Sequence, residues 1–255
     1  MAESAPCLWV VVPCRNEARG IGATLAALQA QTDRDFTLLL VDNASTDGTR
    51  GVIEAWHGAH PGFALLCMDE AERGPGAAAD TGFRFAIAAG ATHVARTDAD
   101  CLPNPEWVAR IKQAFGEGAA FVAGRIGFRT DDCRLGWAEH IGLRLVAALM
   151  AGVAPLLPHN RGPQFKARYL MAGGGNLALT SPLYLASGGF PRMRLEDGND
   201  DRELVNRVRK VSADLRSDRR MFVRQSARRI KRYGIRNTVL WYWNRKVRPD
   251  EVDVR

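Results

Sequence analysis

The sequence has few of the features that would take it outside the ordinary globular class. Its five cysteines are odd in number and lack CxxC spacing, so they support neither a disulfide framework nor a structural zinc site and favour reduced thiols in the cytoplasm. No fixed-period repeat occurs, and no basic stretch precedes the apolar residues 8–12. The longest apolar tract, residues 145–157, is shorter than the ~20 residues of a membrane-spanning helix. We therefore expect a soluble, cytoplasmic protein.

What the chain has in excess is positive charge, +7 in net, and most of that excess follows Arg202. Basic stretches such as residues 205–210 and 226–236 suit phosphate groups or anionic lipid, or form a solvated helix face. No nucleic-acid-binding motif accompanies them, so nucleic acid is not expected as a partner. Two interpretations stay open for the apolar helix expected at residues 137–150. It packs in the core or in a homodimer, or it contacts the inner face of the membrane together with the basic tail.

Apolar, β-branched runs alternate with helical patterns through the first hundred residues. Strands are expected at residues 8–13, 36–43, 62–69 and 92–100, with helices between them. This alternation predicts an α/β fold with a mostly parallel sheet flanked by helices. The second half is less regular: helices are expected at 107–115, 137–150 and 202–211, and a strand at 119–128.

Acidic residues gather where three of these strands end. Glu17 follows the first strand, Asp42 and Asp47 follow the second, and Asp98 and Asp100 end the fourth. Ligands of parallel sheets sit at the carboxyl ends of the strands. Asp98 and Asp100 are two positions apart, so on extended chain they point the same way, and two close carboxylates repel unless a cation lies between them. The pair predicts a divalent metal shared with substrate phosphates; the alternative is a polar turn before the next helix.

Five segments then occur in a recognisable order. They are VVPCRNE, LLLVDNASTDGT, DTGFRFAIAAG, TDADCLPNPEWV and GGF followed by NDDRELVNRV. Over roughly residues 8–230 the chain resembles the family 2 glycosyltransferases of GT-A fold. The resemblance implies an inverting enzyme that moves a sugar from a nucleotide-diphosphate donor, expected to be a UDP-sugar, to a hydroxyl of a saccharide or lipid-linked acceptor, with Mn²⁺ or Mg²⁺ as cofactor.

The sequence has no clean linker, so a single domain is expected, and the resemblance assigns roles within it. One domain spans residues 1–255, with a nucleotide-sugar-binding half (1–100), an acceptor and catalytic-base half (101–225) and a basic tail (226–255). Asp100 would bind the metal, with Asp98 beside it. The nucleotide would be bound by Pro13, Arg15, Glu17, Asp42, Asn43 and Asp98, and the residues near donor or acceptor would be Gly174, Gly175, Asn176, Arg228 and Arg229.

Three positions depart from the family pattern. Asn43 stands where a second Asp is frequent, Ala79 where Arg or Leu is frequent, and Asp80 where Asn is usual. Arg73 and Arg96 are the two candidates to supply a compensating cation.

Inversion requires a carboxylate that takes the proton of the attacking hydroxyl. The resemblance makes Asp201, in DDREL, the expected base, and Asp197, in LEDG, is the alternative. Either residue would also suit the positive end of a helix dipole. The segment Gln225–Arg229 has Arg where the processive relatives have the Trp of QxxRW, so a non-processive enzyme is expected.

Two other functions share some of these features. A sugar nucleotidyltransferase also uses acidic metal sites, but it requires a glycine-rich phosphate loop after the first strand, and CRNEARG is not one. A degenerate transferase that only binds nucleotide or membrane is compatible with Asn43, Ala79 and Arg229. The retention of Asp98, Asp100 and Asp201 favours the enzyme.

Overall fold

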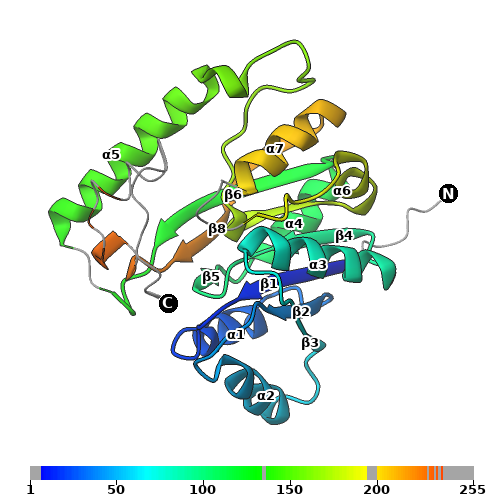
Figure 1. The fold of residues 1–255 in the computed structure, drawn as a ribbon, viewed down its shortest axis with the longest axis vertical. Coiled ribbons are helices and arrows are strands. Elements are labelled where there is room, and N and C mark those ends of the chain that lie inside the picture. Colours follow the sequence, from blue (N-terminus) through cyan, green and yellow to red (C-terminus); the bar gives the residue numbers. More distant parts are fainter. Residues whose placement is uncertain are drawn as a thin grey trace.

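The computed structural model describes residues 7–133, 136–193, 200–228, 230–232, 234 and 237. Its strands form one sheet in the order β3-β2-β1-β4-β7-β6-β8-β5, with helices on both sides (Figure 1). The strands are β1 (Leu8–Cys14), β2 (Thr37–Asp42), β3 (Leu65–Asp69), β4 (His93–Arg96), β5 (Cys101–Pro103), β6 (Phe121–Phe128), β7 (Leu177–Thr180) and β8 (Leu215–Gln225). The helices are α1 (Ile21–Gln29), α2 (Thr49–Ala59), α3 (Pro75–Ala88), α4 (Trp107–Gly116), α5 (Trp137–Val153), α6 (Ser181–Ser187) and α7 (Asp200–Val211), with short 3-10 turns η1 (Ala154–Leu156), η2 (Pro158–Asn160) and η3 (Gly174–Asn176).

The first four strands are parallel, as the alternating pattern predicts. β1 pairs with β2 and β4, and β2 pairs with β3, all in parallel. In this register Cys14 lies beside Asp42, and Asp42 beside Asp69. The carboxyl ends of these strands therefore meet at one edge of the sheet, which is where the acidic residues were expected.

The second half of the sheet reverses direction. β7 is antiparallel to both β4 and β6, β8 is parallel to β6, and β5 is antiparallel to β8. Because Arg96 pairs with Leu177, the amino end of β7 meets the carboxyl end of β4. The glycine-rich turn η3, which directly precedes β7, is thereby brought to the acidic edge.

Strand β8 was not expected from the sequence. Its eleven residues LRSDRRMFVRQ include five that are charged. Only Met221 and Val223 alternate into the core, where both are fully buried. An inward alternation of two residues is too short to stand out in a basic stretch, so the pairing with β6 decides the strand.

Two apolar layers enclose the sheet. Residues of α1, α2 and α4 pack with Val10 and Val12 on one face, whereas α3, α6 and α7 pack with Val11 on the other. Because side chains alternate along a strand, the run LWVVVP supplies both layers and is buried throughout.

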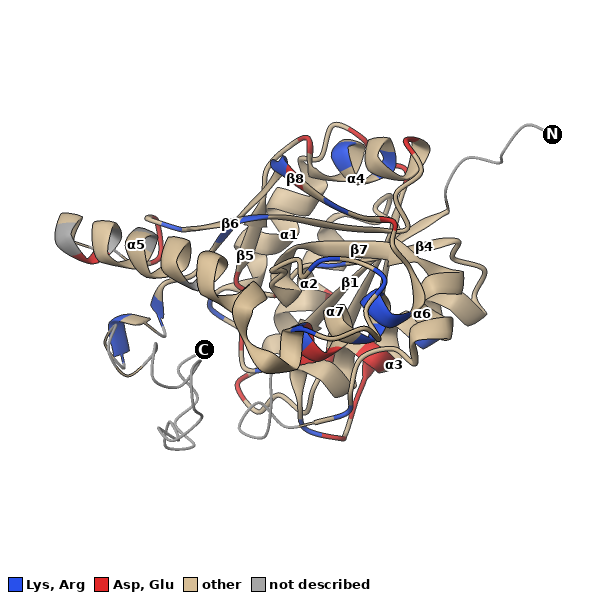
Figure 2. Cartoon of the chain, turned by 90° about the horizontal axis from the view of Figure 1, so that it is seen from above, with Lys and Arg blue, Asp and Glu red and all other residues tan. Residues whose placement is uncertain are grey.

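Helix α5 extends away from this double layer (Figures 1 and 2). Trp137, Ile141, Leu145 and Leu149 recur every four residues along it and are 50–80% exposed. Within the described part of the chain, no helix has the length and apolar character needed to cross a bilayer.

Candidate active site

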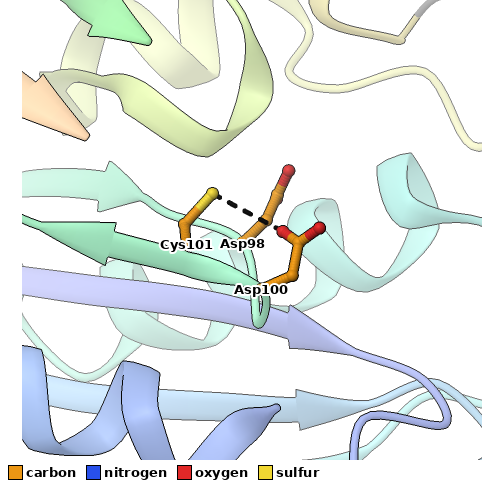
Figure 3. Close-up of side chains that lie close together, drawn as sticks. All are labelled: Asp98, Asp100 and Cys101. Atoms are coloured by element: carbon orange, nitrogen blue, oxygen red, sulfur yellow. Dashed lines mark hydrogen bonds between the residues drawn. The ribbon is translucent and has the colours of Figure 1, made fainter. Parts of the chain in front are cut away.

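The loop after β4 carries the aspartate pair. The side chains of Asp98, Asp100 and Cys101 form a group whose potential ligand atoms all lie within 4.8 Å of one another (Figure 3). The Cys101 thiol donates to Asp100 Oδ1 at 3.6 Å, and burial raises the pKa of this thiol, so it stays protonated. Two carboxylates then offer the hard oxygen ligands that Mg²⁺ and Mn²⁺ prefer. The residues therefore fit a hard divalent ion.

A buried arginine joins this pair to the start of α7. Arg96 Nε lies 3.0 Å from Asp98 Oδ1, and Arg96 Nη1 lies 2.9 Å from Asp200 Oδ2 and 3.4 Å from Asp201 Oδ1. Of the two arginines considered as compensating cations, Arg96 is thus at the acidic edge. Arg96 and Asp98 are two positions apart at the end of one strand, a spacing that places them on the same side.

Asp201, the expected base, lies in the first turn of α7. It also accepts a hydrogen bond from the backbone of Gly174. Burial and the neighbouring charge of Asp200 raise the pKa of the Asp201 carboxyl above its ordinary range, against the opposing effect of Arg96. A carboxylate with a raised pKa is a stronger proton acceptor. The alternative base, Asp197, lies outside the described residues.

The turn η3 covers these carboxylates with backbone alone. A side chain on Gly174 would overlap Asp201 Oδ1 and lie 2.7 Å from Arg96 Cζ, and one on Gly175 would lie 3.3 Å from Asp98 Oδ2. Only glycine allows this close approach.

The side chain of Asn176 anchors the turn η3 to the neighbouring strands and to α4. Its side chain accepts from Trp107 Nε1 at 2.8 Å and donates to the carbonyls of Arg125 and Met221, both at 2.9 Å. Asn176 is completely buried, so in this structure it fixes the position of the glycines next to it.

The loop after β1 meets the end of β8. Glu17, 3% exposed, accepts from Arg228 Nη2 at 2.7 Å, and Arg228 Nε lies 3.6 Å from Asp132 Oδ2. Pro13 is buried within β1, and Arg15 Nη1 donates to the Asn43 carbonyl at 2.8 Å. Arg229 lies outside the described residues.

The end of β2 is closed by its own side chains. The Asp42 carboxylate accepts from the N–H and the hydroxyl of Ser45. Asn43 Nδ2 donates to the carbonyls of Glu70 and Glu72, and Asn43 Oδ1 accepts from the Gly74 N–H at 2.8 Å. Both polar atoms of the Asn43 amide are therefore engaged with the backbone.

Asp47, the remaining acidic residue of this edge, serves the start of α2. Its Oδ1 accepts from the Thr49 N–H at 3.0 Å, and its Oδ2 accepts from the Ala18 N–H at 3.0 Å. Asp47 thus ties the first loop to the second.

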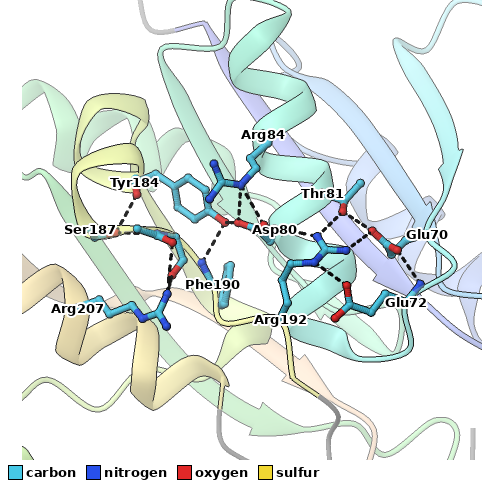
Figure 4. Close-up of polar contacts among 12 residues, drawn as sticks. Glu70, Glu72, Asp80, Thr81, Arg84, Tyr184, Ser187, Phe190, Arg192 and Arg207 are labelled. Carbon is cyan, nitrogen blue, oxygen red and sulfur yellow. Dashed lines mark hydrogen bonds and ion pairs between the residues drawn. The ribbon is translucent and has the colours of Figure 1, made fainter.

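Figure 4 shows a polar network that fastens the segment before α7 to α3. Asp80 accepts from the Tyr184 hydroxyl at 2.6 Å, and that hydroxyl accepts from the Phe190 N–H at 3.1 Å. Arg192 donates to Glu70 at 2.8 Å. The departure at Asp80 thus supplies a buried acceptor between α3 and α6, and the network holds the chain that leads toward Asp200.

Two further residues reach the edge without having been expected there. Arg129 Nη1 donates to the Asp100 carbonyl at 3.3 Å, and Asp132 lies beside Arg228. Arg129 follows β6, and its N–H donates to the carbonyl of Gln225 at the end of β8. No local sequence pattern predicts the contact of Arg129, because it depends on the pairing of β6 with β8.

Comparisons with known proteins identify the family of the chain. A family model described as glycosyl transferase family 2 matches residues 9–171, more than half of the chain. Over 131 residues the chain is 33% identical to the glycosyltransferase AglE of Haloferax volcanii, a match that covers 50% of this chain and 42% of AglE.

Solved structures share the fold. The mannosyltransferase PcManGT from Pyrobaculum calidifontis, in complex with GDP-Man and Mn²⁺, is 24% identical and has a TM-score of 0.64; the match covers 95% of this chain and 65% of that one. Residues 1–349 of S. aureus TarS, in complex with UDP-GlcNAc, are 15% identical with a TM-score of 0.54, covering 84% and 59%. The expected GT-A fold is confirmed, and the chain spans less than two thirds of each relative's length.

Proposed function

The chain belongs to glycosyl transferase family 2, and we propose that it is an inverting, non-processive enzyme that transfers a sugar from a UDP-sugar to an acceptor hydroxyl. The observation that carries the proposal is the juxtaposition at the end of β4. There the Asp98–Asp100 pair, which fits a divalent ion, is linked through Arg96 to Asp201.

The residues divide the reaction between them. Asp100 and Asp98 hold Mn²⁺ or Mg²⁺, which when bound neutralises the departing diphosphate. Asp201 takes the proton of the acceptor hydroxyl. The hydroxyl oxygen attacks the anomeric carbon from the face opposite the diphosphate, and the bond between that carbon and the diphosphate breaks. Gly174 and Gly175 let the backbone of η3 pack directly against these carboxylates, because a side chain at either position would crowd them.

The nucleoside side of the donor lies along the ends of β1 and β2 in this proposal. Pro13, Arg15, Glu17 and Asp42 line it, and Asn43 supports it through the backbone contacts that fix the loops after β2 and β3. Arg228, already paired with Glu17, supplies positive charge near the diphosphate.

The test is a transfer assay with a panel of UDP- and GDP-sugars, saccharide and lipid-linked acceptors, and Mn²⁺ or Mg²⁺. We expect metal-dependent transfer from a UDP-sugar, with an inverted anomeric configuration in the product by NMR. Asp100→Ala should abolish it, and Asp218→Ala, a control on β8 whose carboxylate pairs with Arg220, should not. Retained configuration, or full activity of Asp100→Ala, would contradict the proposal.

A membrane contact follows from a separate observation. We propose that the apolar face of α5, formed by Trp137, Ile141, Leu145 and Leu149, rests on an anionic lipid surface. Lys231 pairs with Glu139 at 3.2 Å, which joins the basic segment after β8 to the start of α5. Apolar side chains beside cations complement lipid with negative headgroups. A lipid-linked acceptor would be reached on the same surface.

A further inference from the structure

Arg96 is a deeply buried cation at the acidic edge. Its side chain is 4% exposed, and its Cζ lies 5.1 Å from the centre of the Phe190 ring. One guanidinium serves three carboxylates, because Nε faces Asp98 while Nη1 faces Asp200 and Asp201. A residue of the metal pair and the expected base are therefore held by a single buried charge.

The contacts require the shape of arginine as well as its charge. The partners lie on different elements, Asp98 in the loop after β4 and Asp201 on α7. A planar guanidinium presents separate N–H groups in both directions at once, whereas a lysine ammonium is a compact point charge on a flexible stem. A charge this deeply buried is tolerated only when it is paired, so the four side chains constrain one another.

We propose that Arg96 is a positioning residue that holds Asp201 in place for proton transfer and at the same time weakens divalent-metal binding at Asp98 and Asp100. This inference rests on the proposed function. The first effect follows from the hydrogen bonds of Nη1, which fix the start of α7. The second effect follows from charge. The Arg96 guanidinium repels a metal ion and already occupies one of the two carboxylate oxygens of Asp98.

The two effects predict opposite changes in one variant. In Arg96→Met, Mn²⁺ should bind roughly tenfold more tightly, because the repulsion of one nearby charge is removed. The same variant should lose roughly 10²-fold in kcat at saturating metal and donor, because the base is no longer held in place. A residue needed only for folding would not tighten metal binding while it slows transfer.

Arg96→Lys separates charge from shape. It retains the positive charge, so Mn²⁺ affinity should stay within about threefold of the wild type, whereas kcat should still fall because an ammonium cannot hold both partners. The matched control is Arg209→Met. Arg209 is 2% exposed and donates to Asn206 and to the carbonyls of Asn160 and Ala167. Its removal tests the loss of a buried arginine remote from the metal pair.

The experiment is calorimetric titration of each purified protein with Mn²⁺ without substrate, followed by steady-state kinetics and thermal unfolding. Unchanged or weaker Mn²⁺ binding in folded Arg96→Met would overturn the inference. If that variant does not fold, a wild-type kcat in Arg96→Lys overturns it instead. Asp100→Ala distinguishes the failures: Mn²⁺ binding that survives in Asp100→Ala contradicts the proposed metal site itself, whatever the Arg96 variants do.

Discussion

At the scale of single residues, the acidic edge is an electrostatic arrangement in which few cations serve many carboxylates. Arg96 is shared by three aspartates, and Arg228 lies between Glu17 and Asp132. Burial and the neighbouring charge of Asp200 raise the pKa of the Asp201 carboxyl, and the shared Arg96 offsets this only in part. A carboxylate with a raised pKa such as that of Asp201 suits proton transfer, since it gains a proton readily.

We predict that Asp201→Asn loses activity and gains stability. Without the base, kcat should fall about 10²- to 10⁴-fold. Because the folded-state pKa of Asp201 is raised, its ionised form costs stability at pH values above that pKa, and the cost disappears as the pH falls below the ordinary carboxyl range. The variant should therefore melt at a higher temperature than the wild type near pH 8, and the difference should shrink toward about pH 4.

The control for this prediction is Glu203→Gln, in the same first turn of α7. The substitution removes a carboxylate from the helix N-terminus. In the wild type, Glu203 pairs with Arg207 on the helix surface. Its activity should stay near that of the wild type. An unaltered kcat in Asp201→Asn would mean that another carboxylate is the base. Asp197→Asn is then the next variant to assay.

At the scale of secondary-structure elements, the loops at the sheet edge are held by side chains that replace missing backbone contacts. Asn43 joins the end of β2 to the loop after β3 and to the start of α3 through three hydrogen bonds. Two of these need a donor on the side chain. The amide is therefore required by its neighbours, whichever nucleoside base lies beyond it.

We predict that Asn43→Asp is destabilising, although an aspartate is frequent in the relatives at this position. It would place a carboxylate against the carbonyls of Glu70 and Glu72, which then lose their donor. The expected loss is about 1–3 kcal/mol in the free energy of unfolding, measured by denaturant titration. Asn16→Asp, in the neighbouring loop after β1, is the comparison. Equal stability of Asn43→Asp and the wild type would mean that these loops rearrange freely.

Helix α5 provides a second prediction at this scale. The double variant Ile141→Gln/Leu145→Gln should lose at least roughly tenfold in affinity for phosphatidylglycerol vesicles, since each exposed side chain forfeits on the order of 1 kcal/mol of transfer free energy. Cosedimentation measures it, and added salt should weaken binding of the wild type. Leu66→Gln, an exposed apolar residue on β3, is the control. A dimer that the double variant dissociates, with no vesicle binding, would assign the face to a second copy of the chain.

At the scale of the whole molecule, the site is distributed over segments that only the complete sheet brings together. The edge takes Glu17 from the loop after β1, Asp98 from that after β4, η3 from before β7, Asp201 from α7 and Arg228 from after β8. Binding a ligand that touches all of them should stabilise the fold as one unit.

We therefore predict that a true donor raises the melting temperature only together with the metal. At a donor concentration about one hundred times its Kd, the gain is about 2.7 kcal/mol, or on the order of 5–10 °C for a chain of this size. Thermal unfolding with each nucleotide sugar, with Mn²⁺ or with EDTA, measures it. Asp100→Ala should show no metal-dependent shift, and a shift that persists in EDTA would mean that nucleotide binding does not depend on the ion.

The local sequence determined the parallel half of the fold. Runs such as LWVVVP and TLLLV are apolar throughout because both faces of a parallel strand are buried, and acidic residues directly after them must lie at one edge. The Asp98–Asp100 pair could be predicted for the same reason, because it directly follows such a strand. The family pattern then indicated Asp201 and the glycines of η3.

What only the tertiary structure decided is how the second half completes the edge. Strand β8 is too charged to be read as a strand, and its pairing with β6 brings Arg129 beside Asp100, and Arg228 beside Glu17. Arg96 acquires Asp200 and Asp201 as partners only because α7 begins beside the end of β4. The contacts of Arg96 with Asp200 and Asp201, and of Arg228 with Glu17, join residues more than a hundred positions apart. Their energies depend on burial and mutual geometry, which no local pattern in the chain encodes.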